Sequence, residues 1–215
     1  MKNMKTLLAA AVAASAIAAP AMADGLSGSV GVASTYLWRG YDLGSGTPAV
    51  SGDLSYSMSG AYAGIWGSSG DTSAGTEYDL YAGYGMEFDG GFSFDVSVWN
   101  YNYPTGAGYT PDGETDFGDL TDVILTVGFA GASFSYYQPV AAGAADYNYY
   151  TLSYGVGAFS ATLGMHDYSK GDDPVHLDIT YAYNDNLSFT FSQFVSDEPQ
   201  GDDLKFVVSY SIPIK

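Results

Sequence analysis

Hydrophobic and polar residues alternate with a period of two over most of the chain. In the clearest example, Val175, Leu177 and Ile179 are each separated by one polar residue. This alternation is typical of a strand with one apolar and one polar face. The predicted strands are 26–38, 49–58, 61–68, 77–88, 92–103, 119–130, 132–140, 147–157, 159–168, 175–184, 187–196 and 203–213.

The connections between these strands alternate between short and long. Tight turns are expected at 59–60, 89–91, 131, 158 and 184–186, and longer loops at 39–48, 69–76, 104–118, 141–146, 169–174 and 197–202. Outer-membrane barrels show this alternation because their periplasmic turns are short and their extracellular loops longer. We therefore predict an all-β fold, a closed antiparallel transmembrane β-barrel of about 12 strands in the cell outer membrane. If a loop fills its lumen, the longest, 104–118, is the expected one.

The N-terminal residues have the pattern of a secretory signal peptide. Lys2 and Lys5 precede an apolar run over 6–19, and an Ala-x-Ala cleavage site ends at Ala23. The run is shorter than the roughly 20 residues that a membrane-spanning helix needs. We expect residues 1–23 to be cleaved and residues 24–215 to form the barrel.

A soluble β-sandwich would also alternate, and the polar positions distinguish the two folds. They carry mainly Ser, Thr and Gly, whereas a soluble surface is rich in Lys and Glu. The residues expected to face lipid are Val50, Leu54, Leu80, Val96, Val98, Val123, Leu125, Val127, Leu152, Leu163, Leu177, Ile179, Phe189, Phe191, Phe206 and Val208. Aromatic girdles at the two interfaces are expected from Tyr36, Trp38, Tyr56, Tyr62, Trp66, Tyr78, Tyr84, Tyr181 and Tyr183.

The charge of the chain restricts its partners. The sequence has 6 basic and 24 acidic residues. Two of the basic residues lie in the leader, so four remain against 24 acids and the net charge beyond it is −20. This balance argues against nucleic acid, which needs a basic patch. The expected partners are outer-membrane lipid and small solutes or cations; nothing in the sequence indicates an oligomeric state.

Three stretches resemble a known family in order and spacing. They are Ser34-Thr35-Tyr36-Leu37-Trp38-Arg39-Gly40, Gly60-Ala61-Tyr62-Ala63-Gly64-Ile65-Trp66-Gly67-Ser68 and Glu77-Tyr78-Asp79-Leu80-Tyr81-Ala82-Gly83-Tyr84. They are similar to the TorF family of porins, also catalogued as a proteobacterial outer-membrane family of unknown function. The resemblance covers the N-terminal third of the chain and implies an outer-membrane porin.

Charged residues on the inward parity form the candidate selectivity site. Arg39 is expected to end the first strand and to meet Lys205 on the seam that closes the barrel. Facing carboxylates are expected from the outer ends of other strands. The pore-lining set is Arg39, Glu77, Asp79, Asp122, His176, Asp178 and Lys205. Because the inward acids outnumber the bases, we expect a cation preference, although mutual pairing of these charges is an alternative.

Other functions have weaker support in the sequence. His166 and His176 lie near Asp167, Asp178, Ser160 and Ser169, but no motif singles out a serine nucleophile. The same residues lack the spacing of a metal site, and no cofactor is expected. We therefore predict a non-enzymatic, porin-like channel for small hydrophilic, preferentially cationic, solutes. The alternative is a non-conducting structural or interaction protein whose acidic extracellular loops bind cations.

Overall fold

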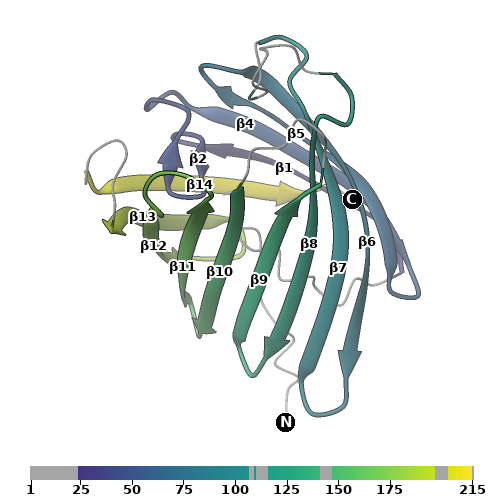
Figure 1. Cartoon of the computed structure of the whole chain (residues 1–215). Coiled ribbons are helices and arrows are strands. Elements are labelled where there is room, and N and C mark those ends of the chain that lie inside the picture. The colour runs from purple at the N-terminus through teal and green to yellow at the C-terminus, as the bar shows by residue number, and fades with distance from the viewer. Residues whose placement is uncertain (1–23, 107–108, 110–115, 141–146, 197–202, 215) are drawn as a thin grey trace.

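Twelve antiparallel strands close into a barrel in the computed structural model (Figure 1). The structure describes residues 24–106, 109, 116–140, 147–196 and 203–214. The predicted signal peptide, 1–23, lies outside these residues. The wall consists of β1 (Gly25–Ala33), β4 (Ala49–Met58), β5 (Ala61–Asp71), β6 (Gly75–Phe88), β7 (Phe92–Asn102), β8 (Leu120–Phe129), β9 (Ala132–Pro139), β10 (Tyr147–Val156), β11 (Phe159–Tyr168), β12 (Val175–Ala182), β13 (Leu187–Ser196) and β14 (Lys205–Pro213). The predicted fold class is confirmed.

Each strand pairs with its neighbours in sequence, and β1 closes the ring by pairing with β14 and β4. Strands β4, β11 and β13 have the bounds that the alternation predicts. The connection expected at 69–76 is shorter than predicted, because β5 continues to Asp71 and β6 begins at Gly75. We call the end of the barrel that carries residues 34–48, 72–74 and 169–174 the loop end, and the opposite end the turn end.

The expectation that the first strand continues to residue 38 is wrong. The chain leaves the wall after Ala33 and forms a small hairpin of β2 (Leu37–Trp38) and β3 (Tyr41–Asp42). The two residues between these strands have left-handed backbones, with φ of 48° at Arg39 and 86° at Gly40. Positive φ at both central residues defines the tight turn that matches strand twist, and glycine adopts the second of these conformations without strain.

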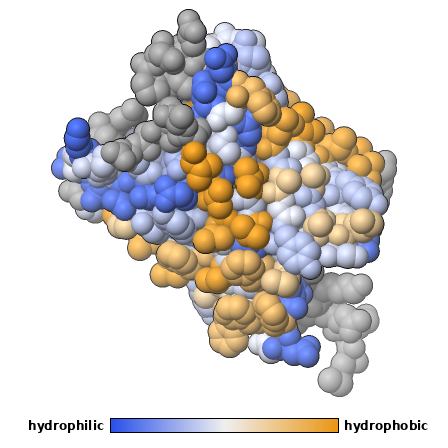
Figure 2. All heavy atoms as spheres, turned by 45° about the vertical axis from the view of Figure 1, so that its right-hand side comes forward, coloured by the Kyte–Doolittle hydropathy of each residue, from blue (hydrophilic) through white to orange (hydrophobic). Residues whose placement is uncertain are grey.

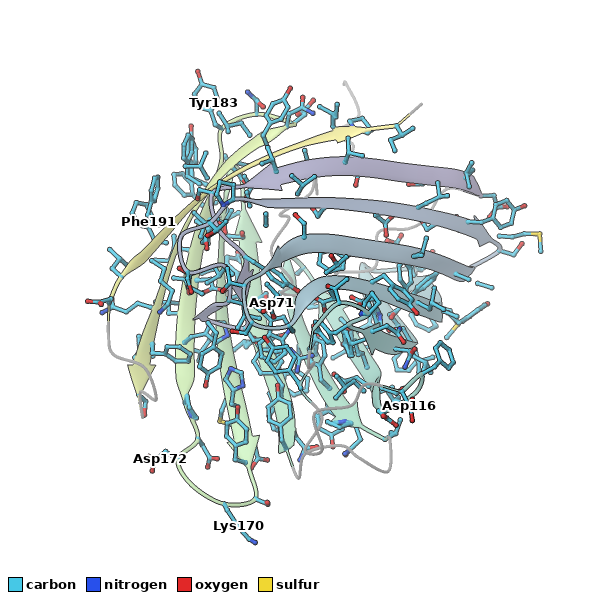
Figure 3. The ribbon with its side chains drawn as sticks, turned by 90° about the horizontal axis from the view of Figure 1, so that it is seen from above. Asp71, Asp116, Lys170, Asp172, Tyr183 and Phe191 are labelled. Atoms are coloured by element: carbon cyan, nitrogen blue, oxygen red, sulfur yellow. The ribbon has the colours of Figure 1, made fainter. Side chains whose placement is uncertain are left out.

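The outer surface of the barrel is apolar. Leu54, Leu152 and Phe206 are 46%, 56% and 50% exposed, and the other residues expected to face lipid are exposed or half-buried. Figure 2 shows hydrophobic residues over much of the wall that it draws, and in Figure 3 Phe191 and Tyr183 point away from the barrel. The described residues contain no helix that is long and apolar enough to cross a membrane. This surface fits an outer-membrane protein.

Part of the predicted aromatic girdle instead faces the lumen. The Tyr36 ring lies 6.2 Å from that of Trp66, and the hydroxyl of Tyr62 donates to Asp95 inside the barrel. Trp38 belongs to the inner hairpin. The alternation was misread here because an aromatic residue has the same pattern whether it covers a lipid interface or packs inside a narrow barrel. Tyr56, Tyr84, Tyr181 and Tyr183 remain exposed on the outside.

Candidate functional site

Residues 34–48, which include the β2–β3 hairpin, fold into the loop end of the lumen. We call them the inner segment. Tyr36, Leu37 and Arg39 are buried, with 5%, 3% and 5% of their surfaces exposed. The loop expected to fill the lumen, 104–118, lies partly outside the described residues. Among the described residues, the inner segment also enters the lumen, which the sequence analysis did not predict.

Arg39 lies at the tip of the hairpin and reaches the wall opposite β1. Its Nη2 donates to Asp122 Oδ2 of β8 at 3.0 Å, and its Nη1 donates to the hydroxyl of Tyr147 on β10. The guanidinium carbon also lies 4.6 Å from the ring centre of Tyr137 and 4.7 Å from that of Tyr149. Arg39 therefore binds a carboxylate and several aromatic faces at once.

This position contradicts the expected pairing of Arg39 with Lys205 on the seam. Lys205 begins β14, and its Nζ lies 5.1 Å from the ring centre of Phe194 on β13. Arg39 instead crosses the lumen to β8, because the chain turns inward six residues before it. The two bases therefore contact different parts of the wall.

His176 and Asp178 face the lumen, as predicted, and with Tyr149 they form a chain of hydrogen bonds. His176 Nδ1 lies 3.0 Å from Asp178 Oδ1, and His176 Nε2 lies 2.8 Å from the Tyr149 hydroxyl. A carboxylate only accepts, so Nδ1–H donates to Asp178, and in the neutral ring Nε2 then accepts from the Tyr149 hydroxyl. These hydrogen bonds orient the ring of Tyr149, which forms one side of the Arg39 site.

Two glycines make room for the His176 ring. A Cβ at Gly40 would lie 2.7 Å from His176 Cγ, and a Cβ at Gly164 would lie 2.1 Å from His176 Nε2. The hairpin tip is held from the other side as well, because His166 Nε2 donates to the Arg39 carbonyl at 2.8 Å. The backbone and the side chain of Arg39 are thus both fixed by wall residues.

Glu77 and Asp79 also face the lumen near the loop end. Glu77 accepts from Tyr36 at 2.6 Å and from Tyr103 at 2.8 Å. Burial raises the pKa of the Tyr36 hydroxyl well above its ordinary value, and the charge of Glu77 raises this pKa further, so the hydroxyl stays protonated and donates. Asp79 is 3% exposed, and its Oδ1 accepts no hydrogen bond from the described residues.

A further acidic group, Asp71, is buried near the β5–β6 turn. Asp71 Oδ1 accepts from the backbone N–H of Ser73 at 2.8 Å and of Ala74 at 2.7 Å, and its Oδ2 accepts from the Tyr109 hydroxyl. Viewed from above, Asp71 lies near the middle of the ring of strands (Figure 3). The sequence pattern does not identify this residue, because Asp71 falls in a stretch, 69–76, that reads as an extracellular loop.

The turn-end half of the lumen is organised differently. Asp53 accepts from Tyr81 at 2.6 Å, and Asp95 accepts from Tyr62 at 2.9 Å. Each tyrosine lies over a glycine of the adjacent strand, because a Cβ at Gly64 or Gly83 would lie 2.4 Å from the Tyr81 or the Tyr62 ring, respectively. The remaining inward positions carry small polar residues, such as Ser97, Thr126 and Ser135.

A pocket of about 580 Å³ opens beside the inner segment. Thr35, Tyr41 and Asp42 line one side of it, and Phe194 and Lys205 line the other. It therefore lies between the hairpin and strands β13 and β14, away from the Arg39 contacts on β8 and β10. This is a polar hollow at the loop end with both signs of charge in its lining.

The predicted site residues thus fall into separate groups. Asp122 binds Arg39 directly, and His176 and Asp178 hold Tyr149 beside it. Glu77 and Asp79 lie in a second group, and Lys205 lines the pocket. The described residues hold no cluster of His, Cys, Asp or Glu arranged for a metal ion. The sequence analysis missed Tyr137, Tyr147 and Tyr149 as parts of the site, and their inward parity was the signal that could have identified them.

Comparisons with known proteins support the fold and leave the activity open. The family described as "Bacterial protein of unknown function (Gcw_chp)" matches residues 17–185. No curated protein matches the chain. One matching solved structure comes from work described as "Unveiling the Mechanism Behind the in-meso Crystallization of Membrane Proteins". It has a TM-score of 0.53 and 12% sequence identity, and the match covers 88% of this chain and 83% of the other.

Proposed function

The chain belongs to the Gcw_chp family, for which no function is described, and we propose that it is an outer-membrane channel for small hydrophilic, preferentially cationic, solutes. The similarity of residues 34–40, 60–68 and 77–84 to TorF porins supports this proposal. So does the apolar outer surface, since so large an exposed hydrophobic area is a liability in water but favourable in lipid.

The observation that carries the proposal is the charge of the lumen. The inward carboxylates of the described strands are Asp53, Glu77, Asp79, Asp95, Asp122 and Asp178. In the described part of the chain, Arg39 and Lys205 are the Arg and Lys residues that face them. Most of these carboxyl groups are hydrogen-bonded to neutral tyrosines, so the inward acids outnumber the bases that could pair with them. Such a surplus in a confined space attracts cations and repels anions.

The inner segment makes the proposed channel a narrow one. Arg39 and Tyr36 hold it against β8 and β6, in the loop-end half of the lumen. The pocket beside it, lined by Asp42 and Lys205, is the entry we propose for solutes. We therefore expect a small conductance while the inner segment is docked and a larger one when it leaves the lumen.

We propose no catalytic role for the lumenal histidines. The ring nitrogens of His176 are engaged by Tyr149 and Asp178, so its hydrogen bonds organise the Arg39 site instead of activating a serine. His166 donates to the backbone of Arg39. Both histidines thus support the position of the hairpin.

Conductance of the purified protein in a planar lipid bilayer tests this proposal. We expect small single-channel steps and, across a salt gradient, a reversal potential of the sign for cation preference. An anion-selective channel would contradict the proposed role of the carboxylates. A folded, inserted barrel without any conductance would instead favour the alternative, a structural or interaction protein whose acidic loops bind cations.

A further inference from the structure

The side chain of Arg39 occupies a cage built by the barrel wall. On the wall side, Asp122 of β8, Tyr137 of β9, and Tyr147 and Tyr149 of β10 contact its guanidinium group. On the other side the ring of Trp38, from the hairpin itself, lies 4.6 Å from the guanidinium carbon. Strands β8, β9 and β10 are consecutive neighbours in the ring, so their inward side chains form a single concave patch. The patch is part of the wall, whereas Arg39 comes from the inner segment.

Contacts among wall residues hold the cage in shape independently of Arg39. Tyr149 pairs with Tyr137 in register, and their rings lie 5.2 Å apart. His176 fixes the Tyr149 hydroxyl at 2.8 Å. Tyr147 stacks on Tyr168 at 5.0 Å. The wall side of the cage would therefore persist if the hairpin and Trp38 moved away, leaving the Asp122 carboxylate beside several aromatic faces.

The cage has the chemistry of a cation receptor that favours a planar cation. Two different nitrogens of one guanidinium donate to Asp122 and to the Tyr147 hydroxyl, while the faces of Tyr137 and Tyr149 lie against its central carbon. A guanidinium offers donors in a rigid planar fork and stacks on aromatic rings, whereas an ammonium is a compact and strongly hydrated point charge. The geometry therefore fits a guanidinium better than an ammonium ion.

We infer that this cage, formed by Asp122, Tyr137, Tyr147 and Tyr149, is a binding site for guanidinium-bearing solutes, and that Arg39 is a tethered occupant which such solutes displace. The inference rests on the proposed channel function, because it names a class of solute for the same lumen. Displacement of Arg39 would release the hairpin tip from the wall and widen the passage. The site thus couples recognition of a solute to opening.

Binding of methylguanidinium to the purified protein in detergent micelles tests the inference. A tethered group competes at a millimolar effective concentration, so we expect the affinity for methylguanidinium to be at least about tenfold higher in Arg39→Ala than in the wild type. Methylammonium is expected to bind the variant more weakly. Addition of Asp122→Asn to Arg39→Ala should abolish the gain, whereas the matched variant Lys205→Ala, which removes the other lumenal base, should show no gain.

The outcomes separate this inference from the channel proposal. Equal affinity in the wild type and in folded Arg39→Ala, or a gain that survives Asp122→Asn, would overturn the cage as the binding site. If methylguanidinium binds but no variant conducts ions, the cage is supported and the channel proposal is contradicted. If the protein conducts ions but methylguanidinium does not bind, the channel proposal is supported and the cage is contradicted. If Arg39→Ala does not fold, Arg39→Lys is measured in its place. A lysine side chain can still enter the cage, but it lacks the planar donors of a guanidinium and competes less well with methylguanidinium. Equal affinity in that variant and the wild type would also overturn the inference.

Discussion

The two halves of the lumen share one wall but are organised by contacts of different range. At the loop end, Asp122 and Glu77 bind Arg39 and Tyr36, residues of the inner segment that are 83 and 41 positions away in sequence. At the turn end, Asp53 and Asp95 bind Tyr81 and Tyr62 of the wall itself. The loop-end half therefore depends on a docked segment, whereas the turn-end half is part of the sheet.

This difference indicates which contacts can be lost while the barrel stays closed. Undocking the inner segment would break the contacts of Arg39 and Tyr36 but none of the strand pairings in the wall. Loss of the turn-end contacts would disturb tyrosines packed over glycines of adjacent strands. We expect variants of the loop end to change conductance strongly, and variants of the turn end to change it little.

The largest effect is expected from Arg39→Gln. This change leaves Asp122 buried without its ionic partner, and breaking a buried ion pair costs about 3–5 kcal/mol. We expect the inner segment to undock, single-channel conductance to rise and cation preference to increase. Planar-bilayer recordings of Arg39→Gln beside Lys205→Gln measure this, and an unchanged conductance in Arg39→Gln would contradict the blocking role of the segment.

Packing of the hairpin tip on His176 gives the second prediction. An alanine at Gly40 would bring its Cβ within 2.8 Å of two atoms of the histidine, at a position with φ of 86°. Gly46 also has positive φ, 73°, but a Cβ there meets nothing within 4 Å. Overpacking costs about 1–3 kcal/mol, so Gly40→Ala should destabilise docking by about that much more than Gly46→Ala. Trypsin or pronase cleavage of the inner segment, followed over time, compares the two variants; equal cleavage rates would show that only backbone strain matters.

Removal of single tyrosine hydroxyls compares the two halves directly. Tyr36→Phe deprives the buried Glu77 of a donor at 2.6 Å, and a hydrogen bond to a charged group contributes about 1.5–3 kcal/mol. Tyr81→Phe deprives Asp53, which is half-buried and can be solvated by water, so we expect about 1 kcal/mol or less. Urea unfolding of both variants in micelles gives the two free energies, and a larger loss for Tyr81→Phe would reverse the proposed order.

Selectivity is expected to show the smallest difference. The combined variant Glu77→Gln with Asp79→Asn removes two carboxylates near the entrance. A charge acts on an ion about 4 Å away in water with about 1 kcal/mol, so the cation-to-anion permeability ratio should fall by about fivefold. The matched pair Asp53→Asn with Asp95→Asn should lower it less, because these carboxylates lie in the turn-end half, away from the proposed entry beside the inner segment. Reversal potentials in a salt gradient measure both ratios; an unchanged ratio in the first variant would exclude Glu77 and Asp79 from the selective site.

The sequence by itself determined the wall of this protein. Alternation along β4, β11 and β13 predicted their bounds and faces, because a strand repeats every two residues and its register depends on its immediate neighbours. The inward positions of Glu77, Asp122 and His176 followed from the same parity. These are local properties, so a single segment of sequence contains them.

Only the tertiary structure decided what fills the lumen. Tyr36 and Trp38 keep the apolar parity of β1, yet the chain turns inward there, because Arg39 finds Asp122 and aromatic faces on strands far away in sequence. The energy of that docking lies in contacts across the barrel, which leave no periodic signal. The expected meeting of Arg39 with Lys205 failed for this reason: strand direction specifies depth along a wall, whereas the location of a loop side chain depends on the partners that closure of the barrel places opposite it.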